Sequence, residues 1–285
     1  MKVSSLEDYE SVISEIKDRF DSQFVGSPFH LLFRGHALES YKLLPTIARD
    51  KRSVDEILDL EKRIQQEFEK RMVDGYIGTV KLNFPQDCSS FYYKWCIQFQ
   101  IRHLELPTRL IDWSMRPEVA LFFAVSNPRH HGSDGHVWVH PSIKDFARLK
   151  QNPTIERMKK EYLHLSAGFD DLNVLGNIDP FNPEKITLVH NSYSGSEFRK
   201  QIGEVRKARQ AGKFTVSTNA KILVSLDKTF IGQNMIKIIV DGSAKQGILD
   251  KVLAKYPNLE EWLLPEIPHD TLVLLDEIRA VTTNR

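Results

Sequence analysis

Short apolar segments typical of strands and longer stretches with helical periodicity follow one another along this chain in no regular order. A parallel sheet built from repeated strand–helix–strand units needs regular alternation, so this pattern favours the α+β class. Apolar spacing predicts helices over 6–20, 53–76, 89–103, 117–125 and 245–254. The segments expected to form strands are 30–33, 108–114, 136–140, 186–190, 213–216, 222–224 and 235–240.

Polar residues mark where several of these helices begin. Ser5 is a candidate N-cap for the first helix, and Ser53 followed by Glu56 forms a capping box for the second. Pro117 suits the first turn of the helix 117–125, which Ser114 or Met115 would cap.

Composition limits the class of protein. The chain has 285 residues, of which 41% are hydrophobic, and a formal net charge of +1. These values exclude a disordered chain and provide enough apolar surface for a large core. No linker interrupts the sequence, so we expect a single domain over residues 1–285. The low net charge leaves room for a local basic patch.

The sequence gives little support for a metal, a disulfide or a membrane anchor. Cys88 and Cys96 are too few for a cysteine scaffold and are expected to be buried thiols. His130 and His131 fall in a loop and are expected to be solvated. No leader and no long apolar segment is visible, which predicts a cytoplasmic protein without a membrane contact. The common nucleotide-binding and hydrolase motifs are absent.

Arg34 directly follows an apolar segment that predicts a buried strand. A guanidinium is costly to desolvate, so it needs a partner. The partner is either a carboxylate inside the fold, such as Asp112 or a glutamate, or an anionic ligand such as a pyrophosphate. The adjacent Gly35 allows a backbone turn or the close approach of a ligand.

A second cluster covers residues 107–114. Arg109 and Asp112 lie three residues apart, so on a strand they face opposite sides and contact different partners. Asp112, Trp113 and Ser114 come just before a helix N-terminus, where free amides favour a ribose or phosphate group. The alternative is that Asp112 and Ser114 only cap that helix.

A third cluster is basic and is offset only by Glu204. Such a segment is either a solvated face or a surface that follows a nucleic-acid backbone. Its candidate nucleic-acid-binding residues are Arg199, Lys200, Arg206, Lys207 and Arg209.

Together these clusters resemble the FRG domain family over residues 31–216. The first motif of that family is similar to Phe33, Arg34 and Gly35 followed by Tyr41, Leu44, Pro45 and Arg49. The second is similar to the segment His103–Ser114, and the third to Arg206, Gln210, Gly212 and Phe214. Two positions depart from the family pattern: Arg102 replaces a glutamine, and Glu105 replaces a glycine. The second departure bears on the geometry of the local turn, because glutamate disfavours a positive φ.

A weaker resemblance, to mono-ADP-ribosyltransferases, implies a split β-sandwich core with N-terminal and inserted helices. The motif-bearing core would cover about 29–216, with residues 217–285 completing it and 146–182 as an insertion or lid. Arg34 corresponds to the arginine of that superfamily and Ser114 to its serine, whereas Gln210 stands near the position of its last glutamate.

The resemblance implies an enzyme that consumes NAD and transfers ADP-ribose, with RNA as the expected acceptor. Arg34, Gly35, Arg109, Trp113 and Ser114 would bind NAD, while Asp112, Gln210 and His103 would act on the reacting groups. Members of the family resemble toxins or anti-phage effectors, which implies an antitoxin or other neutralising protein. Two alternatives remain: a non-catalytic module that senses a ligand or binds nucleic acid, and a metal-independent ribonuclease using His103 and Arg109.

Overall fold

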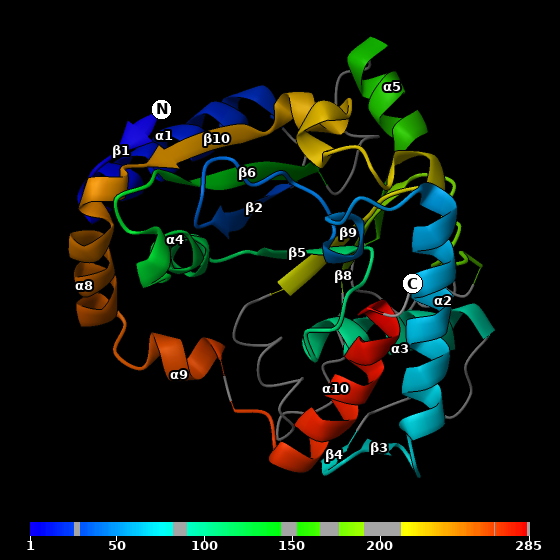
Figure 1. Ribbon diagram of the computed structural model, residues 1–285. Helices are drawn as coiled ribbons and strands as arrows, with labels where there is room; N and C mark the ends of the chain where they lie inside the picture. The colour runs from blue at the N-terminus through cyan, green and yellow to red at the C-terminus, as the bar shows by residue number, and fades with distance from the viewer. Residues whose placement is uncertain are drawn as a thin grey trace.

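The computed structural model describes residues 1–25, 29–81, 90–143, 153–165, 177–190, 212–264 and 266–283. Its centre is a mixed eight-stranded sheet with the strand order β1-β10-β6-β2-β5-β9-β8-β7 (Figure 1). The pairs β1–β10 and β7–β8 are parallel, and the other pairs are antiparallel. This arrangement of a mixed sheet with several helices confirms the α+β class.

The strands agree with the sequence pattern at all but one of the expected positions. The strands of the sheet are β1 (Lys2–Val3), β2 (Phe29–His36), β5 (Leu110–Ser114), β6 (Gly135–Ile143), β7 (Tyr162–Leu165), β8 (Ile186–His190), β9 (Gly212–Val216) and β10 (Ile236–Val240); β3 (Tyr76–Ile77) and β4 (Val80–Lys81) form a separate hairpin. The strand expected over 222–224 is wrong. A backbone bond from the Val224 amide to the Lys221 carbonyl (2.9 Å) closes a turn there, and Leu223 and Val224 are exposed.

The helices of the described segments are α1 (Leu6–Gln23), α2 (Val54–Arg71), α3 (Ser90–His103), α4 (Pro117–Val125), α5 (Pro153–Glu161), α8 (Lys245–Lys255), α9 (Leu259–Leu263) and α10 (His269–Thr283). Two of them begin directly after the predicted capping residues. Ser5 caps α1, and Ser53 with Glu56 forms the capping box of α2, so both predictions are confirmed. No helix in these described segments is long and apolar enough to cross a bilayer.

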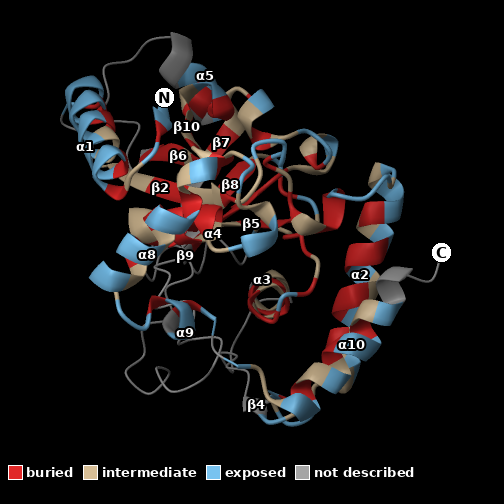
Figure 2. Ribbon diagram, turned by 60° about the vertical axis from the view of Figure 1, so that its left-hand side comes forward, coloured by how far each residue is buried: buried red, intermediate tan, exposed pale blue. Residues whose placement is uncertain are grey.

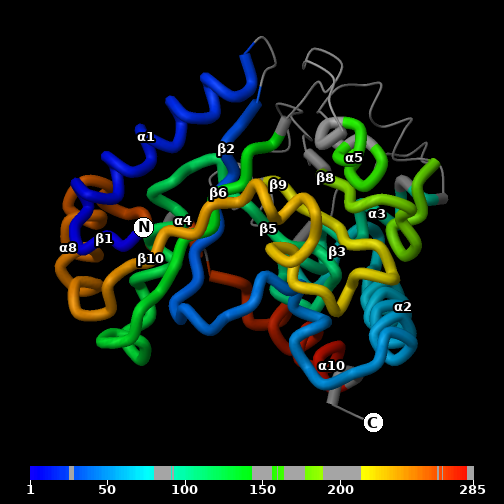
Figure 3. The backbone as a smooth tube through the Cα atoms, turned by 90° about the horizontal axis from the view of Figure 1, so that it is seen from above, coloured from blue at the N-terminus to red at the C-terminus, as the bar shows by residue number. Residues whose placement is uncertain are grey.

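Two groups of helices cover the sheet at its two ends. Apolar residues of α1, α4 and α8 form one core with β2, β6 and β10, and the helices carry their exposed residues on the outside (Figure 2). At the other end, α2, α3 and α10 pack on one another, and α3 also packs on β5 and β9. Seen from above, α1 lies beside α8 and α2 beside α10, at opposite sides of the molecule (Figure 3).

The sheet divides between β2 and β5. Strand β2 pairs with β6 over eight residues, from Phe29 to His36, whereas its pairing with β5 consists of the single rung Phe33–Ser114. Strand β5 in turn pairs with β9 over its full length. The four strands β1, β10, β6 and β2 therefore form one half of the sheet, and β5, β9, β8 and β7 form the other.

Gly35 is needed for packing between β2 and α4. A Cβ atom built on Gly35 would lie 1.8 Å from the carbonyl oxygen of Ala120 and 2.9 Å from the amide nitrogen of Ala124. Both neighbours are backbone atoms, so neither can swing aside as a side-chain end would. Gly35 thus lies inside β2 and not in a turn, and the backbone that approaches it closely is that of helix α4; its expected contact with a ligand stays a prediction.

We expect Gly35→Ala to destabilise the protein by about 1–3 kcal/mol or more, because an added methyl group must push α4 away from the sheet. Gly247 provides a matched control, since a Cβ there meets nothing within 4 Å and the residue lies on the exposed side of α8. Gly247→Ala should be neutral or stabilising, because alanine loses less backbone entropy than glycine in a helix. Urea unfolding of both variants measures the difference; equal midpoints would contradict this role for Gly35.

Glu105 adopts a left-handed backbone conformation. Its φ is +63°, in the left-handed region, just after the end of α3. The Leu106 amide donates back to the Ile101 carbonyl (3.0 Å), which closes the helix end. A glycine would adopt this conformation without strain, whereas a glutamate adopts it at a cost. Glu105 therefore forms a strained C-terminal cap of α3.

The expected lid over residues 146–182 and the expected buried cysteines lie only partly within the described segments. Within the supposed lid, α5 and β7 are described, and β7 is the edge strand of the main sheet, whereas residues 144–152 and 166–176 lie outside the described segments. Cys96 is a buried residue of α3, as expected. Cys88 lies outside the described residues.

Candidate functional site: an arginine cluster where the sheet divides

Arg34 meets Asp112 across the gap between the two halves of the sheet. The Arg34 Nη1 donates to the backbone carbonyl of Asp112 (2.6 Å) and lies 2.9 Å from its carboxylate Oδ1. Since β2 and β5 diverge beyond their single rung, this bond reaches a strand carbonyl from the opposite half of the sheet. The internal carboxylate that the sequence offered as one partner for Arg34 is therefore Asp112.

A second arginine holds the same carboxylate. Arg102, at the end of α3, donates from Nε (3.0 Å) and Nη2 (2.5 Å) to Asp112 Oδ1. Burial alone would raise the pKa of Asp112, but the guanidinium groups of Arg102 and Arg34 outweigh it and hold this pKa well below its usual value. The Asp112 side chain is still 34% exposed, so an ionised carboxylate faces solvent at this gap.

A third arginine stands close to this pair. Arg49 follows the short 3-10 helix Thr46–Ala48, and its Nε and Nη2 lie 3.4 Å from the carbonyl of Leu44. Partial burial, followed by repulsion from Arg34 and Arg102, lowers the pKa of Arg49 to about 10. Arg34 and Arg102 bind the Asp112 carboxylate directly, and Arg49 lies close enough for their charges to act on it; we call these three residues the arginine cluster. Their excess positive charge suits an anionic ligand.

A chain of hydrogen bonds through His36 and His136 fixes the orientation of the Arg34 guanidinium. The Arg34 Nε donates to His36 Nε2 (3.0 Å), and His36 Nδ1 lies 3.0 Å from His136 Nε2. Because a guanidinium only donates, His36 Nε2 must accept, so the proton of His36 is on Nδ1. That proton is donated to His136 Nε2, which places the proton of His136 on its own Nδ1 as well.

This chain predicts that His36 and His136 remain neutral in acid. Burial, then Arg34, lowers the pKa of His36 to about 2, and burial, then Lys237, lowers that of His136 to about 3. Unfolded histidines protonate below 6.5. The free energy of unfolding should therefore fall as the pH drops from 6.5 toward the folded values, by at most about 1.4 kcal/mol per pH unit for each ring.

Nitrogen-15 NMR of the two rings checks this prediction. Both should show a protonated Nδ1 and an unprotonated Nε2 throughout the range from about pH 8 to about pH 4. A ring that gains its second proton near pH 6, or one that carries its proton on Nε2, would contradict the proposed chain.

Arg109 lies inside the protein, away from the arginine cluster. Its Nε and Nη2 donate to the Glu61 carboxylate (2.5–2.9 Å), and its Nη1 donates to Asn219 Oδ1 (2.8 Å). Arg109 and Glu61 are each 1% exposed. The expected role of Arg109 in binding NAD therefore gains no support, because its guanidinium is enclosed by the fold. The sequence did place Arg109 and Asp112 with different partners, which is what the structure shows.

Trp113 and Ser114 also have structural contacts. The Trp113 ring is part of a core with Leu32, and its Nε1 donates to Thr215 Oγ1 (3.0 Å). The Ser114 hydroxyl accepts from the Arg116 amide (2.9 Å), just ahead of α4. Arg116 is the N-cap of α4 and has no side-chain capping bond, so the expectation that Ser114 or Met115 would fill the N-cap position is corrected. Both residues are buried, and their expected role in binding NAD stays a prediction.

The remaining candidates lie beside the site or beyond the described residues. His103 is buried, with its ring 5.7 Å from that of Phe214, and its neighbour Arg102 is the residue that contacts Asp112. Since both His103 and Arg109 are buried, the ribonuclease alternative gains no support. Gln210 and the basic residues Arg199, Lys200, Arg206, Lys207 and Arg209 lie outside the described residues.

Three contributors to this site are not among the site residues expected from the sequence, although the sequence holds a signal for each. Arg102 was visible as a departure from the family pattern, and Arg49 as a residue of the first motif. His36 continues the strand period two residues after Arg34, which places both on one face. Within the described segments, no group of three His, Cys, Asp or Glu residues could hold a metal ion.

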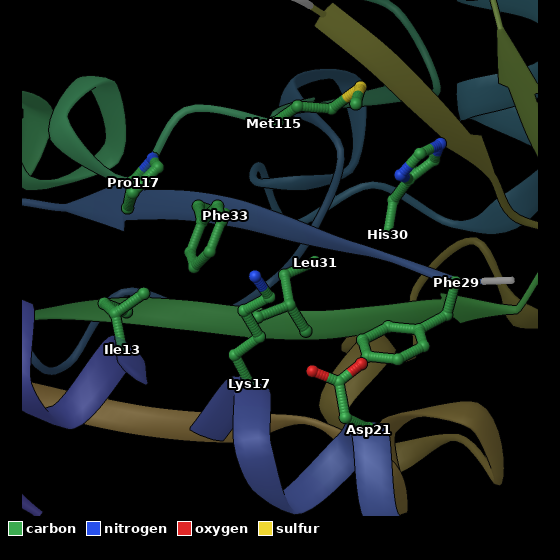
Figure 4. A pocket seen from close by; sticks show the side chains of 9 residues that line it. All are labelled: Ile13, Lys17, Asp21, Phe29, His30, Leu31, Phe33, Met115 and Pro117. Carbon is green, nitrogen blue, oxygen red and sulfur yellow. The ribbon is translucent and has the colours of Figure 1, made fainter. Parts of the chain in front are cut away.

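A cavity of about 450 Å³ lies against β2 on the face that carries Phe29, Leu31 and Phe33, opposite to the face that carries Arg34 (Figure 4). Lys17 and Asp21 project into it from α1, toward the apolar side chains of β2. Its lining residues are Ile13, Lys17, Asp21, Phe29, His30, Leu31, Phe33, Met115 and Pro117. No residue of the arginine cluster and no site residue expected from the sequence is among them.

Comparison with protein families identifies the part of the chain that carries the site. The FRG domain family model matches residues 29–133. Arg34, Arg49, Arg102 and Asp112 all fall within the matched range. A comparison with curated proteins gave no match. A comparison with solved structures gave none either.

Proposed function

We propose that this protein, whose residues 29–133 form an FRG domain, is an ADP-ribosyltransferase that consumes NAD. One observation carries the proposal: two arginines bind a single ionised, partly exposed carboxylate at the gap between the two halves of the sheet, and a third arginine lies near them. Cleavage of the nicotinamide–ribose bond of NAD requires cationic groups that hold the pyrophosphate of the substrate and an ionised carboxylate that stabilises the positive charge developing on the ribose.

The arginine cluster would bind the pyrophosphate of NAD. Guanidinium groups donate two parallel hydrogen bonds to phosphate oxygens, and three of them exceed the charge of one carboxylate. Asp112 would face the ribose. Its low pKa keeps it ionised at neutral pH, so it can stabilise the oxocarbenium-like transition state in which the bond from ribose C1′ to nicotinamide breaks. Nicotinamide leaves with the bonding electrons, and an acceptor oxygen or nitrogen bonds to C1′ and releases its proton.

The division of the sheet supports a split β-sandwich core. The halves joined at Phe33–Ser114 diverge on the side where Arg34 reaches Asp112. The nucleic-acid acceptor, with RNA as first choice, rests on the basic segment 199–213 and on the family resemblance. A toxin or anti-phage role with a neutralising partner rests on that resemblance alone.

Labelled substrate tests the reaction. Purified protein is incubated with NAD labelled in its adenylate phosphate, together with cellular RNA, DNA or protein, and both label transfer and free nicotinamide are measured. We expect label on one acceptor class and an equal amount of nicotinamide. No transfer and no nicotinamide in any arm would rule out the enzyme.

A non-catalytic role is the second candidate, and a specific contact favours it. Arg34 and Arg102 already use Asp112 as their partner, and the Arg34 bond to the Asp112 carbonyl ties the two halves of the sheet together. In that case the network is a structural clamp, and the FRG domain acts by binding a ligand or nucleic acid without chemistry. Separate measurements of folding and turnover distinguish the two candidates.

A further inference from the structure

A groove of about 440 Å³ adjoins the arginine cluster, and we call it the Tyr41–Trp138 groove. It lies between the loop after β2, strands β6 and β10, and the turn around Val224. Its lining residues are Glu39, Ser40, Tyr41, Lys42, Trp138, Leu223, Val224, Ser225, Asp227, Lys228 and Lys237. This volume falls within the range of about 300–1,000 Å³ typical of small-molecule pockets.

The groove and the arginine cluster are neighbours on one face of the sheet. Trp138 is the direct cross-strand partner of Arg34, so the two side chains leave the sheet side by side. The Tyr41 ring lies 6.2 Å from that of His36, which receives the bond from Arg34 Nε. A ligand bound at the cluster through phosphate would therefore have its adjoining group within reach of the groove.

Part of the surface of the groove is aromatic and apolar. Tyr41 is 46% exposed, Leu223 41% and Val224 39%, and these three are among the few large apolar side chains exposed in the described segments. Trp138 adds a second aromatic ring, with Lys237 Nζ 5.9 Å from its centre. Exposed aromatic faces of this kind stack on nucleobases.

The charges in the groove favour the nucleoside part of a ligand over its phosphates. Lys237 pairs with Glu39 (3.1 Å), and Lys228 pairs with Asp227 (3.4 Å). Two of the three lysines that line the groove are therefore neutralised locally, and Lys42 is the third, whereas the arginine cluster sets three cations against one carboxylate. The carboxylates and the hydroxyl of Ser225 can accept hydrogen bonds from ribose hydroxyls or a base amino group.

We propose that the Tyr41–Trp138 groove binds the base and ribose of a nucleotide whose phosphates lie on the arginine cluster. The proposal rests on the phosphate-binding role given to the cluster above, but not on the transfer reaction. It makes the substrate class a nucleotide with an aromatic base stacked on Tyr41 or Trp138.

Calorimetry with ADP and with inorganic pyrophosphate separates the two parts of the site. Loss of one stacked aromatic residue is worth about 1–3 kcal/mol, so Tyr41→Ala and Trp138→Leu should each weaken ADP binding by about 5- to 150-fold. Binding of pyrophosphate should not change in either variant. Arg49→Gln should weaken both ligands, because both carry the phosphates.

Tyr76→Ala is the matched control, since Tyr76 is similarly exposed (40%) but lies on the separate β3–β4 hairpin. It should bind both ligands as the wild type does. Because Trp138 is partly buried, Tyr41→Ala at the exposed edge keeps the test valid if Trp138→Leu fails to fold. Equal affinities of the wild type for ADP and pyrophosphate, or ADP binding unaffected in Tyr41→Ala, would overturn the proposal.

The groove and the reaction can fail separately. ADP binding that depends on Tyr41, without NAD turnover, would support the groove and remove the transferase. NAD turnover with the same KM in wild type, Tyr41→Ala and Trp138→Leu would keep the transferase and remove the groove.

Discussion

Glu61→Ala is expected to lower the free energy of unfolding by about 3–5 kcal/mol, because it leaves Arg109 as an unpaired charge inside the protein. Both side chains are 1% exposed, and three guanidinium-to-carboxylate contacts of 2.5–2.9 Å join them. Water cannot replace the lost carboxylate at such a position. Thermal and urea unfolding measure the loss.

The double variant Arg109→Met/Glu61→Leu distinguishes a structural pair from a functional one. Apolar residues of similar volume often replace a buried ion pair at little or no cost, so the double variant should regain most of the stability lost by Glu61→Ala. It should also bind pyrophosphate as the wild type does. Weakened pyrophosphate binding in a folded double variant would return Arg109 to the candidate site.

An exposed pair provides the control for this experiment. Glu7 and Lys251 are joined at 2.8 Å but are 66% and 53% exposed. Glu7→Gln should leave the unfolding midpoint essentially unchanged, because solvent screens such pairs and the side chains lose entropy in forming them.

Local rules predicted the features of this protein that depend on neighbouring residues. The caps at Ser5 and Ser53 and the proline-started helix α4 follow from side chains within one turn. The segment after Thr218 shows the limit of such rules. Ile222, Leu223 and Val224 have strand-like composition, but the preceding 3-10 helix turns the chain and no strand of the sheet pairs with them.

The sequence holds a partial signal for two long-range contacts, the Glu61–Arg109 ion pair and the packing of Gly35 on α4. Glu61 lies on the buried stripe of α2, four residues after Ile57 and three before Ile64, where an acid needs a buried cation. Ala120 and Ala124 are small residues one helical turn apart, and they form the surface against which Gly35 packs. In both cases the partner stayed unknown, because it depends on which elements the fold places side by side.

The site itself was predictable only in part. Arg34 and Asp112 were named as possible partners, and the structure joins them, although 78 residues separate them in sequence. The excess positive charge depends on Arg102, which binds Asp112 from the end of α3, and on Arg49, which lies nearby in a loop. Their convergence depends on the position of α3 against β5, which no local pattern encodes.

Replacing Asp112 by asparagine should reduce NAD turnover by about 10²- to 10³-fold, the usual loss when a group that stabilises transition-state charge is removed. The same change should strengthen pyrophosphate binding, since Arg34 and Arg102 lose the carboxylate that neutralises them. Arg34→Gln should instead weaken pyrophosphate binding. Calorimetry with pyrophosphate and nicotinamide release from NAD measure the two effects.

In Asp112→Asn, tighter pyrophosphate binding together with lower NAD turnover distinguishes a functional site from a purely structural clamp. The folded-state pKa of Asp112 is depressed, so its ionised form stabilises the fold above its ordinary pKa of 3.8, and that stability is lost as the pH falls further. If the network is only a clamp, Asp112→Asn lowers the unfolding midpoint at pH 7, and pyrophosphate affinity does not rise. If it is a site, the folded variant binds the anion more tightly while turnover is lost, because the carboxylate opposes binding of the anion and acts only as the ribose becomes positive.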